Sequence, residues 1–366
     1  MKIFHVSDTH LGYSAYHKIS EDGLNQREVD VYNSFEQFVD YSIKNKPDII
    51  IHSGDLFDSV RPNNRAIVFA IKQLIRISEA KIPFIIISGN HETPKLRETG
   101  SILKIFEHIP YIYPVYKGKL EEIEIGEAII HAIPHCFSNE ELKKNIDSLK
   151  IRKDFLNILT MHVGIIGIKE FRSGDLNEQI IPSGYLSEDF DYIALGHYHK
   201  GVQVTKNAYY SGSTEHLSFK EAGEAKGFYE VNISDKLKLS FIPLKVRGMI
   251  DFGKIDCSEI SSDEIIEEFL KRIKEYDIKE KIARIEFKSI SREKYKMLEW
   301  EKIKNVTSVA LHFEIIHEFI EIENVKGKTK IRSIEEEWRE YISQLNIKEK
   351  EEIEKLALKY LEEVKN

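Results

Sequence analysis

Short β-branched runs that alternate with helical segments constrain the fold of this chain more than any other feature. Several of the runs end directly in Ser-Gly, Gly-Asn or Gly-His, which are pairs typical of turns. The strand candidates are Lys2–Val6, Asp48–His52, Phe84–Ile87, Ala128–Ile133, Ile158–His162 and Tyr192–Leu195. Helices are expected between the early strands, at Val31–Asn45 and Asn64–Ala80. Beyond Tyr198 the spacing becomes that of hairpins, so an α/β core that continues into an antiparallel region is expected over residues 1–245.

A change of composition near residue 246 predicts a second, smaller domain at 246–320. Its pattern alternates strands and helices. The expected elements are a helix at Asp263–Glu275 capped by Ser262, a strand at Ala283–Phe287, a helix near Arg292–Ile303 and a strand at Ser308–Ile315.

The last segment is predicted to be a helical hairpin. Residues 321–332 have the composition of a linker, and residues 333–366 contain two amphipathic helices that begin at capping boxes. A hairpin this small cannot bury its own apolar face. It must dock on the body of the protein or on a partner, and the linker favours the partner.

Composition and charge exclude several classes of protein. Hydrophobic residues make up 42% of the chain, which excludes a largely disordered protein. No apolar run approaches the length of a membrane span, and the N-terminus lacks the apolar run of a signal peptide. Cys136 and Cys257 cannot form a disulfide framework, so a cytoplasmic location is expected.

The net charge of −8 leaves the question of partners open. Residues 333–366 alone hold ten Glu against six Lys or Arg, which accounts for four of the excess negative charges. The remaining chain is closer to balance, so a nucleic-acid partner is neither required nor excluded.

Five polar clusters follow predicted strands at the edge where sites assemble in layered α/β folds. They are Asp8-Thr9-His10, Gly54-Asp55-Leu56-Phe57-Asp58, Gly89-Asn90-His91-Glu92, Met161-His162 and Gly196-His197-Tyr198-His199. Residues i and i+2 leave an extended chain on the same face, so Asp8 and His10 are expected to approach one ion together. Glycines before Asp55, Asn90 and His197 allow close backbone approach.

Carboxylate, imidazole and amide ligands suit divalent ions such as Mn²⁺, Fe²⁺ or Zn²⁺. Seven such ligands are too many for one tetrahedral ion, so a pair of ions is expected, with Asp55 as the natural bridge because a carboxylate has two oxygens. His5, His52 and His131 lie within apolar strands and are expected to be core histidines. His312 and His317 are given no role.

The ordered set of Asp-x-His, Gly-Asp-x-x-Asp, Gly-Asn-His-Glu, a lone His and Gly-His-x-His resembles the signature of the calcineurin-like metallophosphoesterases over residues 1–200. Within that family the chain looks most like the SbcD-type nucleases of DNA double-strand-break repair. The resemblance implies a four-layer αββα core of two sheets flanked by helices, with a small α/β capping domain and a C-terminal helical hairpin.

The resemblance also implies roles for the site residues. One ion would be held by Asp8, His10, Asp55 and His199, and the other by Asp55, Asn90, His162 and His197. His91 would face the scissile phosphate without being a ligand. Many relatives carry a second catalytic histidine at the position of Asp58, so any catalytic role of Asp58 is in doubt and a supporting role beside the ligands is left to it.

The activity implied is that of a Mn²⁺-dependent phosphodiesterase with two ions per subunit, with Mg²⁺, Fe²⁺ or Zn²⁺ as alternatives. It would act on DNA ends as a 3′–5′ exonuclease and single-strand endonuclease. His17, Lys18 and Arg61, on the loops after the first two strands, are the candidate DNA contacts. A phosphatase or cyclic-nucleotide phosphodiesterase on the same centre is the alternative, and a scaffold without chemistry is a third reading that the intact ligand set disfavours.

Two protein partners are implied as well. The resemblance predicts a homodimer through helices at 64–80 and 95–108, with Phe69, Leu74, Leu103 and Phe106 as contacts unless they belong to the core. It also predicts that the hairpin at 333–366 binds an ABC-type, SMC-like coiled-coil ATPase.

Overall fold

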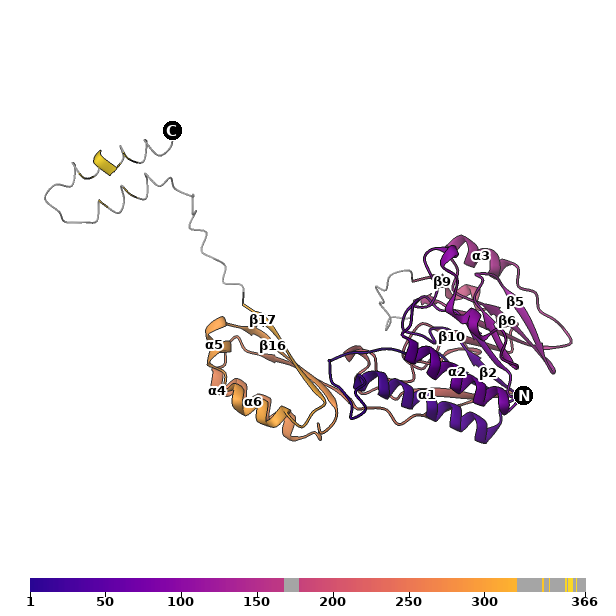
Figure 1. Cartoon of the computed structure of the whole chain (residues 1–366), viewed down its shortest axis with the longest axis horizontal. Coiled ribbons are helices and arrows are strands. Elements are labelled where there is room, and N and C mark those ends of the chain that lie inside the picture. Colours follow the sequence, from indigo (N-terminus) through magenta and orange to yellow (C-terminus); the bar gives the residue numbers. More distant parts are fainter. Residues whose placement is uncertain are drawn as a thin grey trace.

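The computed structural model describes residues 1–167 and 178–320, together with a few positions of the C-terminal segment, namely Trp338, Ile342, Ile353, Lys355, Leu356, Ala357 and Tyr360. The expected linker at 321–332 lies outside the described residues, as does most of the expected hairpin at 333–366. Figure 1 shows the described chain as a larger body, which holds the N-terminus, and a smaller one built on β16 and β17.

The first six-stranded sheet runs in the order β14-β13-β1-β2-β3-β4. Its strands β1 to β4 are parallel, and β13 and β14 add an antiparallel edge. The bounds are β1 Lys2–Val6, β2 Ile49–His52, β3 Phe84–Ile87, β4 Ile112–Val115, β13 Gly227–Ile233 and β14 Leu237–Pro243. Every residue of β2 and β3 is buried, as expected of parallel strands covered on both faces.

The second six-stranded sheet runs in the order β11-β12-β10-β7-β6-β5, with β12, β10, β7 and β6 parallel. The bounds are β5 Glu121–Ile125, β6 Ala128–Ile133, β7 Leu156–His162, β10 Tyr192–Gly196, β11 Val202–Gln203 and β12 Ala208–Tyr210. A short parallel pair, β8 (Gly164–Ile166) and β9 (Ile180–Pro182), lies outside both sheets.

Three apolar layers hold the larger body together. One cluster lies between the sheets and joins side chains such as Ile49 and Ile85 of the first to Ile130 and Ile158 of the second. A second packs α1 (Gln26–Asn45) and α2 (Asn64–Glu79) on the outer face of the first sheet, and a third packs α3 (Asn139–Asp147) on the second. The order of layers is therefore αββα, which confirms the expected fold class.

A third sheet of three parallel strands follows. It contains β15 (Met249–Asp256), β16 (Ile282–Ile290) and β17 (His312–Phe319), and its core includes residues of α4 (Ser262–Lys274) and α6 (Trp300–Thr307). A short helix, α5 (Arg292–Met297), precedes α6. This sheet meets the larger body through a small apolar cluster that includes Phe219, Met249 and Ile282, and through the ring of Tyr16, which stacks on His312 at 4.2 Å.

Several expected boundaries were wrong for local reasons. Helix α1 begins five residues before Val31, because the Asn25 side chain accepts a hydrogen bond from the Arg27 amide and starts the helix there. The cap of α4 is Ser261 rather than Ser262, and it forms a capping box with Glu264. The helix expected near Arg292–Ile303 is two helices, because Leu298 is extended and buried between them. As α6 continues to Thr307, β17 starts at His312 rather than Ser308.

The helix expected at 95–108 was also wrong. The segment forms two short 3-10 turns, η1 (Arg97–Thr99) and η2 (Ile102–Phe106), and Gly100 between them has a φ of +72°. Of the proposed dimer contacts there and on α2, Leu74, Leu103 and Phe106 are fully buried in the core under the first sheet.

No helix among the described residues is long and apolar enough to cross a bilayer.

Candidate metal centre

The candidate site lies where strands of both large sheets end. Asp8, Asp55 and Asn90 follow β1, β2 and β3 of the first sheet, while His162 ends β7 and His197 follows β10 of the second. The carboxyl ends of parallel strands share one edge of a sheet, and stacking the two sheets brings both edges together. All seven predicted ligands are thereby collected at one place.

Ligand atoms converge in three overlapping groups, within each of which the atoms lie within 4.8 Å of one another. The groups are Asp8 with His10 and His199, His10 with Asp55 and His91, and Asp8 with Asp55 and His162. His10, Asp8 and Asp55 each belong to two groups, so the site is continuous rather than three separate ones. Such overlap is what two neighbouring ions with a shared ligand would need.

Asn90 and Asp55 connect the two sheets at the site. Asn90 Oδ1 lies 2.9 Å from His162 Nε2 and 3.2 Å from His197 Nδ1. Asp55 Oδ2 lies 3.1 Å from His162 Nε2 and 3.9 Å from His10 Nε2. The carboxylate of Asp55 therefore stands between histidines of both sheets, as a bridging ligand would.

The backbone reaches this arrangement by a route that the sequence reasoning did not foresee. Asp8 and His10 were expected to lie on one face of an extended chain, but both have left-handed conformations, with φ of 51° and 47°. Asp55 and His197 also have positive φ, at 56° and 107°. Such conformations are uncommon outside glycine and concentrate at functional sites. The grouping of Asp8 with His10 was right, but the reason given for it was wrong.

Two glycines make room for the site. A Cβ on Gly89 would lie 2.1 Å from Asp55 Oδ1, and one on Gly54 would lie 2.4 Å from His162 Nδ1. Gly54 also has a φ of +98°, which a side chain would strain. The close approach expected of these two glycines is confirmed.

Each of the four histidines that were predicted as ligands has its remote ring nitrogen hydrogen-bonded. His10 Nδ1 contacts Asp58 Oδ1 at 3.1 Å, and His162 Nδ1 contacts the Ser53 carbonyl at 2.8 Å. The other two pairs are His197 Nε2 with Glu178 Oε1 at 2.9 Å and His199 Nδ1 with Glu221 Oε1 at 3.0 Å. Acceptors at these positions orient each ring, and the other nitrogen has a lone pair for an ion when the imidazole is neutral.

The chemistry of the donor set therefore fits divalent cations. His10 Nε2 is buried and has no hydrogen-bond partner among the described residues, although it faces two carboxylate-bearing neighbours. Unsatisfied buried nitrogens are costly, and a cation would satisfy this one. The ligand atoms are carboxylate oxygen, imidazole nitrogen and amide oxygen, with no thiolate.

Electrostatics at the site also favour positive charge. Burial opposes ionisation of Asp55, but His162 and His10 outweigh it and hold the pKa of Asp55 well below its usual range. Burial together with His162 lowers the pKa of His197 to about 4, so this ring is neutral at pH 7. Ionised Asp55 and neutral His197 are thus in the state that binds metals. Burial opposes protonation of His162, but Asp55 outweighs it and raises the pKa of His162 to about 9, so this ring must lose a proton when it binds an ion.

Glu92, the last residue of the Gly89-Asn90-His91-Glu92 cluster, is buried and bonds to backbone amides. Its carboxylate accepts hydrogen bonds from the amides of Phe57 at 3.0 Å, and of Leu56 and Gly89 at 3.3 Å. Burial, with the nearby charge of Asp55, raises the pKa of Glu92 to about 8. Glu92 thus ties the loop after β2 to the loop after β3.

His91 lies at the edge of the site. Its ring packs edge-on against His10 with centroids 4.7 Å apart, and its amide donates to Asp55 Oδ1 at 3.0 Å. His91 Nδ1 contacts the carbonyl oxygen of Asp58 at 3.0 Å. Asp58 therefore orients His10 with its side chain and His91 with its backbone.

The remaining predicted residues lie apart from the ligand groups. His17 and Lys18 are exposed on the loop after β1, and Arg61 is exposed on the loop after β2. His5, His52 and His131 are fully buried, which confirms them as core histidines. His312, which was given no role, supports the contact between the two bodies through Tyr16.

Sequence reasoning missed Glu178 and Glu221. Each reaches a histidine about 20 residues away in the chain, and no motif spacing marks either of them. Only the folded positions of the residues just before β9 and of the turn η4 (Phe219–Glu221) show their relation to the site.

Comparison with known proteins identifies the family. The calcineurin-like phosphoesterase profile matches residues 1–225, which is more than half of the chain. This chain belongs to the calcineurin-like phosphoesterase family. The site described above therefore lies within the matched domain.

Two curated proteins are similar to part of this chain. It is 38% identical over 200 residues to the DNA double-strand break repair protein Mre11 of Sulfurisphaera tokodaii, which covers 54% of this chain and 49% of that protein. It is 32% identical over 256 residues to the protein of the same name from Methanococcus maripaludis, covering 66% of each. The match thus spans about half the length of the first relative and just under two thirds of the second.

A solved dimetal phosphatase from Danio rerio aligns with 66% of this chain and 96% of its own length. The identity is 9% and the TM-score is 0.42.

Proposed function

We propose that this protein is a metal-dependent phosphodiesterase that cleaves DNA at ends, as a 3′–5′ exonuclease and single-strand endonuclease in double-strand-break repair. The observation that carries the proposal is the convergence of seven side chains that could ligate metal ions, with His91 beside them. Membership of a phosphoesterase family and relatives named as DNA repair proteins support it.

The two ions would be held by the sets expected from the sequence. One set is Asp8, His10, Asp55 and His199, and the other is Asp55, Asn90, His162 and His197. We propose Mn²⁺ as the ion, with Mg²⁺, Fe²⁺ or Zn²⁺ as alternatives, because the donor atoms suit any of these. When bound, such a pair would neutralise phosphate charge and lower the pKa of water, so that hydroxide is available to attack phosphorus at neutral pH.

His91 would act on the substrate rather than on the ions. The Asp58 carbonyl can only accept, so His91 Nδ1 carries the hydrogen of their 3.0 Å contact. Nε2 is then the atom left for substrate, and as an imidazolium it would donate a proton to the departing 3′ oxygen. Asp58 would position this ring and that of His10 without itself transferring a proton.

DNA would approach over the loops that follow β1 and β2. His17, Lys18 and Arg61 are exposed there, so their side chains are accessible to phosphates. Contacts of this kind release counterions, and affinity should fall steeply as salt rises. A flat salt response of duplex binding would count against this part of the proposal.

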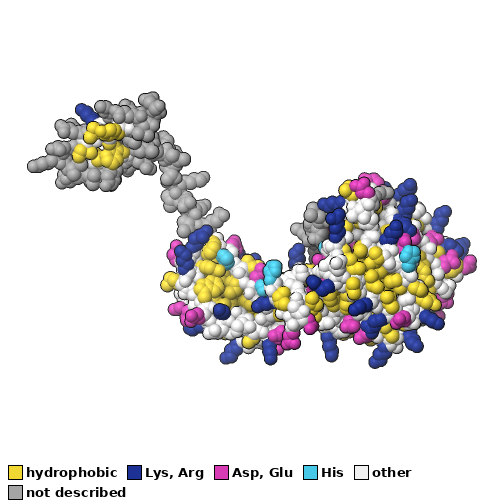
Figure 2. Space-filling view, in the orientation of Figure 1, with side chains coloured by type: hydrophobic (Ala, Val, Ile, Leu, Met, Phe, Trp, Pro, Cys, Tyr) yellow, Lys and Arg dark blue, Asp and Glu magenta, His cyan; other side chains and the backbone are white. Residues whose placement is uncertain are grey.

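The protein would work as a homodimer through residues 64–80 and 95–108. Because Leu74, Leu103 and Phe106 are buried, the contact side chains would instead be the exposed Val68 and Ile75 of α2 with Ile105 of η2, beside the partly buried Phe69. Figure 2 shows apolar side chains gathered on the face of the larger body that carries α2. We also propose domains at 1–245 and 246–320, a linker at 321–332 and a hairpin at 333–366. The hairpin would bind an ABC-type ATPase.

The test is hydrolysis by the purified full chain with Mn²⁺, on labelled single-stranded and blunt duplex DNA beside p-nitrophenyl phosphate. Asp55→Asn should abolish DNA cleavage, whereas the same change at the exposed Asp235 should leave it intact. Cleavage of p-nitrophenyl phosphate without any cleavage of DNA would overturn the proposal in favour of a phosphatase.

A further inference from the structure

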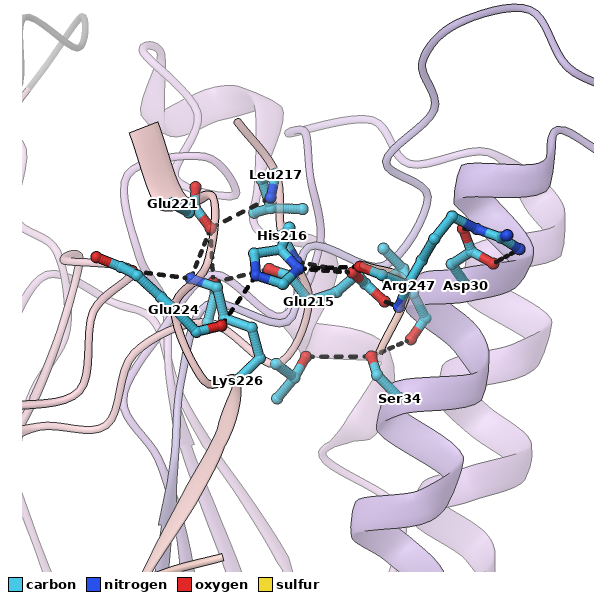
Figure 3. A network of polar contacts seen from close by, with 12 residues as sticks. Asp30, Ser34, Glu215, His216, Leu217, Glu221, Glu224, Lys226 and Arg247 are labelled. Carbon is cyan, nitrogen blue, oxygen red and sulfur yellow. Dashed lines mark hydrogen bonds and ion pairs between the residues drawn. The ribbon is translucent and has the colours of Figure 1, made fainter. Parts of the chain in front are cut away.

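A buried polar network runs from the candidate metal centre toward the third sheet. Figure 3 shows Glu221, Lys226 and Glu224 at one end of this network and Arg247 with Asp30 at the other. Arg247 lies between β14 and β15, and its guanidinium contacts Asp30 of α1 at 2.6 and 2.8 Å. The end that reaches the metal centre is formed by Glu221 and Lys226.

Both oxygens of Glu221 are fully used. Oε1 contacts His199 Nδ1 at 3.0 Å and accepts from Ser218 Oγ at 3.1 Å. Oε2 pairs with Lys226 Nζ at 2.7 Å and accepts from the Leu217 amide at 3.2 Å and from Ser213 Oγ at 3.3 Å. A carboxylate held by five donors has one orientation, and it presents a fixed acceptor to the His199 ring.

Lys226 holds the same histidine by its backbone. Its side chain is 1% exposed, which is rare for lysine. Besides the Glu221 carboxylate, Nζ donates to the His199 carbonyl oxygen at 2.8 Å. The Ser213 amide donates to that same carbonyl at 3.0 Å. The ring and the main chain of His199 are therefore fixed by one buried ion pair.

A buried ion pair such as Glu221–Lys226 adds little net stability to a fold. Replacing a buried ion pair with apolar side chains is often neutral or stabilising, because desolvation of two charges offsets their attraction. The presence of the buried Glu221–Lys226 ion pair is explained if its charges orient a particular group. That group is His199, which has a ring nitrogen within 4.8 Å of ligand atoms of Asp8 and His10.

The turn that carries Glu221 is also supported from its other side. Phe219 of η4 packs with Met249 of β15 and Ile282 of β16, and the guanidinium of Arg284 lies 4.5 Å from its ring centre. Glu221 is therefore placed by contacts on both sides of η4.

We propose that Glu221, locked by Lys226, is a positioning residue that holds His199 in the tautomer and orientation needed to bind one of two metal ions. This inference rests on the proposed function of the site. It predicts an effect on one ion only, because Glu221 touches none of Asn90, His162 or His197 among its described contacts.

The test is a calorimetric Mn²⁺ titration of the metal-free full chain, for the wild type, Glu221→Gln and a matched control. Glu215 is buried as well, at 1% exposed against 6% for Glu221, and lies in the same segment, but it pairs with Arg27 and contacts no predicted ligand among the described residues. Glu221→Gln should weaken one of two Mn²⁺ sites by about 10–100-fold and leave the other unchanged. Glu215→Gln should lower stability and keep both affinities. Co²⁺ in place of Mn²⁺ should show an altered visible absorption spectrum in Glu221→Gln alone.

A second variant, Glu221→Asp, tests the inference if Glu221→Gln does not fold. Glu221→Asp keeps the charge beside Lys226 but shortens the side chain by one carbon, so the protein should fold and still lose affinity at one site. The inference would be overturned if both Glu221 variants bound two Mn²⁺ ions with wild-type affinities, or if Glu215→Gln lost as much Mn²⁺ affinity as Glu221→Gln. Neither result would contradict the metal centre itself. A wild type that binds no Mn²⁺ would overturn the proposed function, and this inference with it.

Discussion

Replacing Gly89 by alanine should disrupt the metal centre through a contact that can be worked out from the structure. The added Cβ would lie 2.1 Å from Asp55 Oδ1, and 2.6 Å from both Cγ and the backbone nitrogen of Asp55. The backbone atom cannot move aside cheaply, so Asp55 must shift. Gly89 does not have a positive φ, and the contact alone is responsible for the effect.

The size of the effect follows from two losses. Relieving an overpacked contact costs about 1–3 kcal/mol. A shift of Asp55 also breaks its hydrogen bond from the His91 amide, which at 3.0 Å to a charged acceptor is worth about 1.5–3 kcal/mol. The free energy of unfolding should therefore fall by about 1–3 kcal/mol if only the clash is felt, and by about 2.5–6 kcal/mol if both losses add.

The assay is urea unfolding followed by Mn²⁺ titration, with Gly184→Ala as the matched control. Gly184 also lacks a positive φ, and a Cβ there would meet nothing within 4 Å. Gly184→Ala should match the wild type in both measurements, whereas Gly89→Ala should lose stability and bind both ions more weakly. Equal unfolding free energies and equal affinities in the two variants would refute the reasoning.

Two further predictions concern histidines with opposite roles. His91→Ala should keep both ions and lose activity by about 10²–10⁴-fold, as expected for a proton donor; a missing ion in that variant would show that His91 is a ligand instead. His5 is fully buried beside the Tyr192 hydroxyl, and burial lowers its pKa from 6.5 to about 3. The unfolded chain therefore takes up the proton first, so the stability that neutral His5 provides is complete above pH 6.5 and is lost by up to about 1.4 kcal/mol per pH unit below it. Unfolding of His5→Gln measured from pH 7 to 4 should show a shallower decline than the wild type, and identical slopes would contradict the assignment.

The central strands could be predicted from sequence because their burial leaves little choice of residue. Phe84–Ile87 and Ala128–Ile133 are buried at every position, and both have the expected bounds. Amphipathic segments were less well placed where a local contact decides the outcome. Gly100 breaks the segment after β3 into two turns, and Leu298 divides the helix before β17, although neither residue is decisive by type alone.

The ligand types of the site could be predicted because they recur at strand ends, whereas their support could not. Asp58, Glu178 and Glu221 each contact a histidine, but these contacts depend on how the sheets and turns pack. The left-handed conformation of Asp8 is likewise invisible in the motif. The clusters therefore predicted which side chains meet, and tertiary structure determines how they are held.

The most direct test of the account is the number of ions bound per chain. The metal-free full chain should take up two Mn²⁺ by elemental analysis and by titration, and Asp55→Asn should reduce both that number and DNA hydrolysis. Fewer than two ions on the saturated wild type, or full binding and hydrolysis in Asp55→Asn, would contradict the claim that Asp8, Asp55 and their neighbours form a two-metal centre.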